Sequence, residues 1–167
     1  MAEELVVGSN ATPASSGVKN YLYVTLFQAI GTANGVTKFY LYGAGSGNVK
    51  VAVYSDNAGA IGSRLAYNDT GQAVVSGWNE LSVSSVNITS GTNYFLIGVS
   101  DVDNIIGRDT SGGTSKYRLA GGDGYSTWAW SDPIGGDAFN SSSALYAYYL
   151  LGETGSLLIP AAHYYMN

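Results

Sequence analysis

The sequence offers few side chains that could perform catalysis. A nucleophile needs an adjacent base, and general acid–base chemistry needs a titratable group whose pKa suits the task. The chain has one histidine, His163, close to its C-terminal end, and any Ser–His–Asp triad would have to use it. No Gly-x-Ser-x-Gly motif occurs. We therefore interpret His163 as a tail residue and do not expect a serine hydrolase.

Carboxylate pairs and phosphate-binding loops are equally weak signals. Gly43, Gly45 and Gly47 match the start of a dinucleotide-binding loop, but Asn48 stands at its sixth position and a strand, not a helix, is expected to follow. Glycosidases hold two carboxyl groups about 5 Å or about 6.5–9.5 Å apart. The candidates here are Glu80, Glu153, Asp101, Asp103, Asp109, Asp123, Asp132 and Asp137. No spacing singles out a pair, so we predict that the protein is not an enzyme.

A calcium site is a stronger candidate. Two carboxylates and an amide follow a predicted strand at residues 101–104, and Ca²⁺ prefers such oxygen ligands. The EF-hand pattern fails because its fifth position is Ile105. No cofactor is required, and the sequence leaves two alternatives. Either Asp101, Asp103 and Asp109 hold a structural calcium ion, or they form a solvated acidic turn.

Two of the three tryptophans, Trp128 and Trp130, lie two residues apart in a Gly/Ser-rich stretch. In an extended segment they would share a face. The C–H faces of sugar rings pack on aromatic rings, and nearby carboxylates and amides bind the hydroxyls. The predicted sugar-binding platform consists of Tyr125, Trp128, Trp130, Asp123, Asp132 and Asn140.

Two other interpretations of these rings stay open. Large aromatic side chains are more often packed than displayed, so the segment would lie over the end of a sandwich with both indoles in a satellite core. Tyr and Trp are also enriched at subunit interfaces.

Short alternating or apolar runs, bounded by Gly, Ser, Asn and Asp, recur along the chain, whereas helical periodicity is scarce. Roughly eight to ten short strands separated by turns favour an antiparallel sandwich. The predicted strands are Tyr21–Ala29, Val36–Tyr42, Val49–Ser55, Leu65–Tyr67, Gly77–Val86, Tyr94–Ser100, Lys116–Ala120, Ala144–Leu151 and Leu157–Ile159.

The predicted fold class is all-β, an antiparallel jelly-roll-like β-sandwich, with an immunoglobulin-like sandwich as the alternative. The length of 167 residues fits one domain. We expect a loose N-terminal arm over residues 1–17 and one sandwich domain over residues 18–151. A long loop insert covers residues 101–143, and residues 152–167 form a C-terminal tail.

The strand predicted at Ala144–Leu151 is apolar on both faces. Tyr146, Tyr148 and Leu150 share one face, and Tyr149 lies on the other. A strand covered on one side only should alternate with polar residues. Either loops cap its second face or that face meets a partner, and the second case predicts a homo-oligomer.

Three motifs occur in a recognisable order: VYSDNAGAIGSRL at Val53–Leu65, Gly77-Trp78-Asn79, and Gly91-Thr92-Asn93-Tyr94-Phe95-Leu96. This order resembles a β-sandwich module that recurs in bacteriophage virion and tail proteins and in secreted bacterial proteins. The resemblance covers about residues 36–100, with Ile61 where the pattern has proline. It implies a binding or assembly role, an extracellular or virion-associated location, and no particular ligand.

Charge excludes several classes of partner. Seven basic and twelve acidic residues give a net charge of −5, and the basic residues do not form the stripe that nucleic acids or anionic membranes require. Without cysteine, neither a disulfide nor a thiolate site is available. Glu3 and Glu4 stand where a signal peptide carries positive charge, and no apolar segment is long enough to span a bilayer.

We therefore expect a non-catalytic module that binds a polysaccharide or a surface glycan. The alternative is a structural capsid, tail or filament subunit whose aromatic surfaces are assembly contacts. The two differ in what Trp128 and Trp130 face: a binding module presents them to solvent, and a structural subunit buries them.

Overall fold

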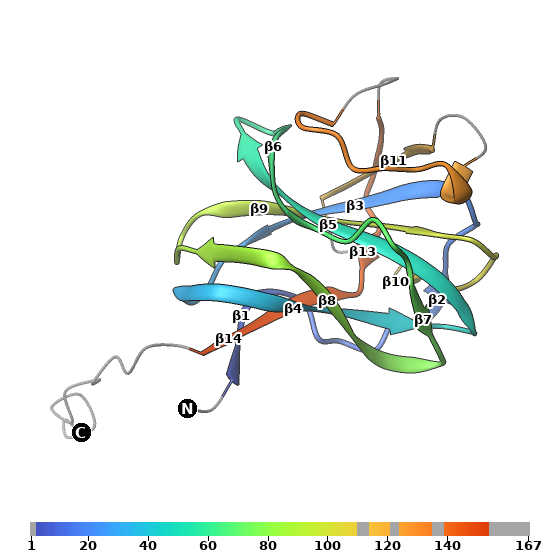
Figure 1. The fold of residues 1–167 in the computed structure, drawn as a ribbon, viewed down its shortest axis with the longest axis horizontal. Helices are drawn as coiled ribbons and strands as arrows, with labels where there is room; N and C mark the ends of the chain where they lie inside the picture. The colour runs from blue at the N-terminus through green and yellow to red at the C-terminus, as the bar shows by residue number, and fades with distance from the viewer. Residues whose placement is uncertain (1–2, 110–113, 121–123, 135–138, 154–167) are drawn as a thin grey trace, which may run out of the picture.

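The computed structural model describes residues 3–109, 114–120, 124–134 and 139–153 (Figure 1). The described part is almost entirely β, which confirms the predicted fold class, and its one helical segment is the short 3-10 helix η1 (Gly124–Ser126). No helix in these ranges is long and apolar enough to cross a membrane. The strands are β1 (Glu3–Gly8), β2 (Ser15–Ser16), β3 (Tyr21–Gln28), β4 (Ala33–Gly43), β5 (Gly47–Asn57), β6 (Ala60–Tyr67), β7 (Gln72–Val74), β8 (Gly77–Ile88), β9 (Asn93–Ser100), β10 (Gly107–Asp109), β11 (Ser115–Leu119), β12 (Asn140–Ser142), β13 (Leu145–Tyr146) and β14 (Tyr148–Glu153).

Two antiparallel sheets form the sandwich, and Figure 1 shows them as stacked layers. Sheet I has the order β1-β14-β4-β8, and sheet II has the order β12-β11-β3-β9-β5-β6. A small third sheet, β13-β10-β2, lies beside them. The order β1-β14-β4-β8 in sheet I and the order β3-β9-β5-β6 within sheet II are those of an eight-stranded jelly roll, in which the chain crosses repeatedly between the two sheets. The sandwich is therefore jelly-roll-like.

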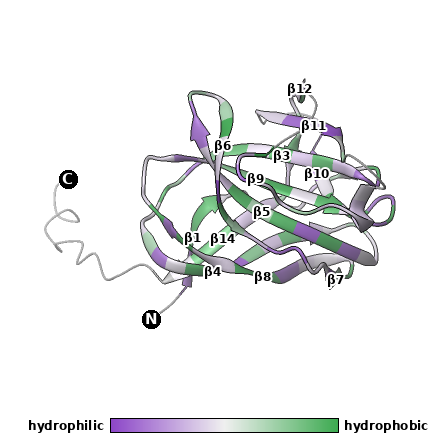
Figure 2. Ribbon diagram, turned by 45° about the horizontal axis from the view of Figure 1, so that its top comes forward, coloured by the Kyte–Doolittle hydropathy of each residue, from purple (hydrophilic) through white to green (hydrophobic). Residues whose placement is uncertain are grey.

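The main core lies between the two sheets. Alternating residues of β5, Val49, Val51 and Val53, enter it from sheet II. From sheet I, Phe39 and Tyr148 enter it, with their ring centroids 5.5 Å apart. Figure 2 shows the matching bands of hydrophobic and hydrophilic residues along strands such as β5. This burial is the largest favourable term that holds the layers together.

The N-terminal segment differs from the predicted loose arm over residues 1–17. Residues Glu3–Gly8 form β1, which pairs with β14 at the edge of sheet I. Val6 and Val7 are fully buried in the main core. The apolar run here is only three residues long and follows two glutamates, so it gives a weak strand signal. Its partner strand lies at the other end of the sequence.

The insert predicted at residues 101–143 is also more structured than a loop. It contains β10, β11, η1 and β12, and β11 extends sheet II by pairing with β3. The last strand, β14, continues two residues beyond the predicted domain end, to Glu153. The predicted strand Leu157–Ile159 and the rest of the tail lie outside the described residues.

Side-chain amides of Gln72 and Asn68 hydrogen-bond the backbone of the edge strand β8 at Ser82. The Ser82 backbone N–H donates to Gln72 Oε1 at 2.9 Å, and Gln72 Nε2 donates to the Ser82 carbonyl oxygen at 3.0 Å. Asn68 Nδ2 donates to the same carbonyl oxygen at 3.0 Å. Because the Gln72 amide bonds β8 as a neighbouring strand would, this part of the edge is not open to further pairing.

Tyr23 should make the free energy of unfolding fall with rising pH in the alkaline range. Its ring is buried in the main core, and burial raises the pKa of Tyr23 to about 12. A tyrosine in the unfolded chain has a pKa of about 10. Between these values the unfolded state has lost the proton and the folded state keeps it, so unfolding becomes easier as pH rises. The stabilisation is complete below about pH 10 and is lost up to about pH 12, at about 1.4 kcal/mol per pH unit.

Urea unfolding at pH values across this window would measure that slope. We expect Tyr23→Phe, which has no titrating hydroxyl, to lose stability less steeply than the parent protein. Equal slopes for the two proteins would assign the alkaline transition to other tyrosines.

Candidate functional site

The predicted tryptophan platform is not present. The Trp130 side chain is only 2% exposed, and its Nε1 donates to the Asn68 carbonyl oxygen at 2.9 Å. The Trp128 ring is half-buried and meets the Trp130 ring edge-on, with centroids 5.6 Å apart and an interplanar angle of 83°. A sugar ring needs exposed faces on which to lie, so these two indoles cannot form the predicted surface.

The segment that carries them instead covers the outer face of sheet II, as Figure 1 shows for the orange chain that passes over β3 and β5. Trp130 packs in a second core with residues such as Leu22 and Phe95. The buried Lys50 ammonium donates to the carbonyl oxygens of Tyr125 at 3.0 Å and Trp128 at 2.8 Å. The satellite-core interpretation therefore fits, except that the segment lies over the sheet rather than over its end.

The other predicted sugar ligands have separate structural roles. Asp132 Oδ1 accepts the Arg64 backbone N–H at 2.9 Å. Asn140 is exposed in β12, opposite Tyr117 in the strand register. Tyr125 is half-buried below Lys50, and Asp123 lies outside the described residues. These contacts do not bring the predicted ligands together.

The predicted calcium ligands are likewise committed to separate turns. Each carboxylate accepts a backbone N–H from a different segment: Asp101 from Asn48 at 2.7 Å, Asp103 from Lys19 at 2.9 Å, and Asp109 from Ala14 at 3.1 Å. Within the described ranges no three His, Cys, Asp or Glu side chains gather as a metal site would require. This arrangement favours the alternative of an acidic turn. His163 and Asp137 lie outside the described residues.

The outer face of sheet I carries four half-exposed aromatic residues. Inward-facing Phe39, Leu41, Tyr148 and Leu150 alternate along β4 and β14 with four half-buried outward-facing aromatics on β4, β8 and β14. In the strand register Tyr149 lies opposite Tyr40, and Tyr42 lies opposite Trp78. We call these four side chains the aromatic row: Tyr40, Tyr42, Trp78 and Tyr149.

The rings of the aromatic row touch one another in sequence. Tyr40 and Tyr149 are stacked, with centroids 4.6 Å apart and an interplanar angle of 4°. Trp78 lies 4.7 Å from Tyr149 at 60°, and Tyr42 lies 5.4 Å from Trp78 at 87°. Such pairs stabilise each other by about 0.5–1.5 kcal/mol beyond their buried area. The row is therefore a preorganised surface whose rings hold their positions before any partner arrives.

Charged groups border the row on one side. The Tyr40 hydroxyl donates to Glu80 Oε2 at 2.6 Å. The Lys38 Nζ atom lies 2.8 Å from Glu3 Oε1 and 3.7 Å from Glu80 Oε2. The hydrogen bond to Glu3, followed by the nearby carboxylate charges, raises the pKa of Lys38. Burial, followed by the bond to Glu80, raises the pKa of the Tyr40 hydroxyl, so it remains a hydrogen-bond donor at neutral pH.

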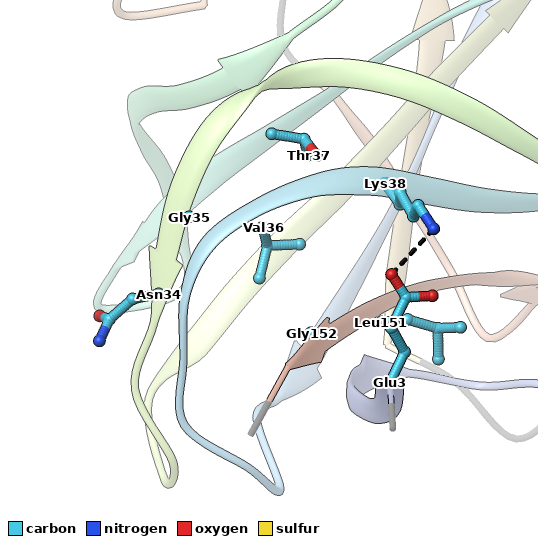
Figure 3. Close-up of a pocket in the computed structure, with 8 residues that line it drawn as sticks. All are labelled: Glu3, Asn34, Gly35, Val36, Thr37, Lys38, Leu151 and Gly152. Atoms are coloured by element: carbon cyan, nitrogen blue, oxygen red, sulfur yellow. Dashed lines mark ion pairs between the residues drawn. The ribbon is translucent and has the colours of Figure 1, made fainter. Parts of the chain in front are cut away.

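A small hollow continues this surface beyond Lys38 (Figure 3). Its volume is about 190 Å³, and Figure 3 shows Lys38 and Glu3 pointing toward each other at its edge. Lys38 stands two residues before Tyr40 on β4, and Leu151 stands two residues after Tyr149 on β14. Residues two apart on a strand lie about 7 Å apart on the same face, so the hollow adjoins the row. It is lined by Glu3, Asn34, Gly35, Val36, Thr37, Lys38, Leu151 and Gly152.

Reasoning from the sequence missed this site, because Trp78 was assigned to a structural motif. Two signals pointed to it. Along Val36–Tyr42 the tyrosines alternate with Phe39 and Leu41, so one face of the strand presents Tyr40 and Tyr42. The other signal was the apolar second face of β14, on which Tyr149 lies.

Comparison with protein-family models gives no match for this chain, and comparison with curated proteins gives no relative. The geometry of the aromatic row and of the adjoining hollow therefore carries the functional argument.

Proposed function

We propose that this protein is a non-catalytic module that binds a polysaccharide or a surface glycan through the outer face of sheet I. One observation carries the proposal: a row of four half-buried aromatic rings lies on the outer face of sheet I, directly beside a polar hollow. Aromatic rings pack against the C–H faces of sugars, and the hollow offers amide, hydroxyl, ammonium and carboxylate groups to sugar hydroxyls. The face thus combines the two contacts that a glycan needs.

The dimensions suit an oligosaccharide better than a compact small molecule. The hollow of about 190 Å³ is smaller than the pockets of about 300–1,000 Å³ that enclose drug-sized ligands. From Lys38 through Tyr40 to Tyr42 the face extends about 13 Å along β4. A terminal sugar in the hollow would place the following sugars on the aromatic row.

The same groups support binding rather than bond cleavage. Glu3 and Glu80, the carboxylates beside the row, both contact the Lys38 ammonium. This is an ion-pair arrangement, whereas glycosidases set two carboxyl groups on opposite sides of the scissile bond in distinct roles. The proposed role of these charges is to hold Lys38, Tyr40 and Glu80 in fixed positions for hydrogen bonding.

A second candidate function is assembly through the same face with another copy of the chain. It is favoured by Leu5 and Leu151, which lie opposite each other in the register and are half-buried. Tyr and Trp are also the side chains that most often dominate the energy of protein interfaces. Burial of Trp130 agrees with this candidate as well, because a structural subunit is expected to bury that side chain.

Replacing Trp78 by Ala tests the proposed function. If Trp78 is an energetic anchor of the site, its truncation should cost about 2 kcal/mol or more, so glycan binding should weaken at least about tenfold. Affinity electrophoresis against a panel of soluble polysaccharides measures the retention. Trp128→Ala is the matched control, because its half-buried indole lies on the segment covering sheet II. We expect that variant to be retained like the parent protein.

Retention that survives Trp78→Ala but is lost in Trp128→Ala would place the glycan site on the segment that covers sheet II. That result would contradict the proposed site on sheet I. If no polysaccharide retains the parent protein, sedimentation velocity decides the second candidate. An oligomer that Trp78→Ala converts to monomer would replace glycan binding by assembly as the function of this face.

A further inference from the structure

We infer that the aromatic row selects amino sugars, whose amine is protonated, over glycans that carry carboxylate or sulfate groups. This inference rests on the proposed function, because it names the class of glycan that the same face accepts. The evidence for it is the distribution of basic and acidic side chains between the two sheets.

Six of the seven basic residues are attached to elements other than those of the row. Lys50, Arg64, Lys116 and Arg118 belong to strands of sheet II. Arg108 lies on β10, and Lys19 precedes β3. Lys38 is therefore the one basic residue in the strands of sheet I.

Lys38 is already paired on both sides. Its Nζ contacts Glu3 Oε1 at 2.8 Å and Glu80 Oε2 at 3.7 Å, so the three groups together carry a charge of −1. An acidic glycan that approached the row would find its only cation neutralised, and it would face an excess carboxylate. The net charge of −5 adds a general repulsion.

Glu80 is the group that would receive an ammonium. Its side chain is 51% exposed, more than those of Lys38 and Glu3. Its Oε2 is engaged by the Tyr40 hydroxyl and by Lys38, whereas its Oε1 has no hydrogen-bond partner among the described residues. The Tyr40 bond fixes the orientation of the carboxylate, so Oε1 is held at the border of the row as a preorganised acceptor.

The rings favour the same charge. The face of an aromatic ring is negative, and cations are attracted to Trp and Tyr when they lie within about 6 Å of the ring centre. Carboxylate and sulfate groups experience the opposite sign. Because Glu80 lies opposite Tyr40 in the strand register, one ammonium could contact both the carboxylate and the row.

The expected preference is modest because the face is wet. At about 4 Å in water, one ion pair changes affinity by roughly three- to tenfold. Salt screens such exposed pairs, and the Debye length falls from about 10 Å at 0.1 M to about 3 Å at 1 M. Most of the preference should therefore disappear at about 1 M salt, whereas binding through ring packing should persist.

Isothermal titration calorimetry on the intact protein would test this with three tetrasaccharides: β-1,4-linked glucosamine, β-1,4-linked N-acetylglucosamine and galacturonic acid. The first two share backbone and linkage and differ in the charged amine. At about pH 5.5 carboxylates are ionised and alkyl amines are protonated. We expect the glucosamine tetramer to bind roughly three- to tenfold more tightly than its N-acetylated counterpart, with the acidic tetramer weakest.

Glu80→Gln removes the charge and keeps an oxygen acceptor, so it should bring the first two affinities together. Asp103→Asn is the matched control, since it removes one negative charge on the loop after β9 and keeps the acceptor for Lys19 N–H. Equal binding of the two tetramers by the parent protein, or a preference that Glu80→Gln leaves unchanged, would overturn this inference and leave the proposed function standing. Failure of all three to bind would overturn this inference, and retention by the polysaccharide panel would then decide the proposed function separately.

Discussion

Trp130→Ala should destabilise the protein by about 3–5 kcal/mol, the range observed when a fully buried large aromatic is truncated. The indole is almost fully buried in the second core, and its Nε1 bonds the Asn68 carbonyl oxygen at 2.9 Å. Truncation leaves a cavity and an unpaired buried carbonyl, which add to the lost apolar burial. Equilibrium unfolding in guanidinium chloride, followed by circular dichroism, measures the change.

Trp128→Ala provides the comparison within the same segment. Its ring is half-buried and its Nε1 has no hydrogen-bond partner among the described residues, so its loss should cost clearly less than that of Trp130. If both variants unfolded like the parent protein, the segment would not be packed on sheet II. The sugar platform predicted from the sequence would then regain its support.

Val7→Asp should destabilise the protein by about 3–5 kcal/mol, because it places an unpaired charge inside the main core. Val7 is fully buried, and β1 closes one edge of sheet I by pairing with β14. Thermal and urea unfolding of the purified variant would measure the loss. The variant distinguishes a strand from the loose arm that the sequence suggested.

Val18→Asp is the matched control for the same substitution, since the Val18 side chain is 55% exposed. It should change stability by less than about 0.5 kcal/mol, as exposed substitutions usually do. A Val7→Asp variant as stable as Val18→Asp would contradict the placement of β1 in the sandwich.

The two layers of aromatics have different physical roles. Trp130 is covered by its own segment and stabilises the fold, whereas Trp78 and Tyr149 lie on the half-exposed outer face of sheet I. The variant pair Trp130→Ala and Trp78→Ala should therefore separate stability from binding. The first should unfold easily, and the second should stay folded with weakened glycan binding.

Local patterning determined most of the sandwich. Within the predicted strand Val49–Ser55, Val49, Val51 and Val53 stand two residues apart and so share one face, and all three enter the main core. Within the predicted strand Tyr21–Ala29, Leu22 and Val24 alternate with Tyr23; they lie in the second core, whereas Tyr23 lies in the main core. These predictions depend only on the two-residue period of a strand, which any neighbour must respect.

Pairing between distant segments was decided by the tertiary structure. The apolar run of β1 is too short to mark a strand by itself, and its burial depends on β14 at the other end of the chain. Trp128 and Trp130 do contact each other, but their spacing in the sequence does not say whether a sheet packs against them. In the structure sheet II supplies that layer, and the rings turn edge-on to pack against it.

The aromatic row shows the same division. The sequence predicted that Tyr149 lies on the second face of its strand, and the same alternation puts Tyr40 and Tyr42 on one face of theirs. It could not bring them together with Trp78 and Glu80, because strand order and register depend on which edges meet in three dimensions. A surface that combines side chains from β4, β8 and β14 exists only once sheet I has formed.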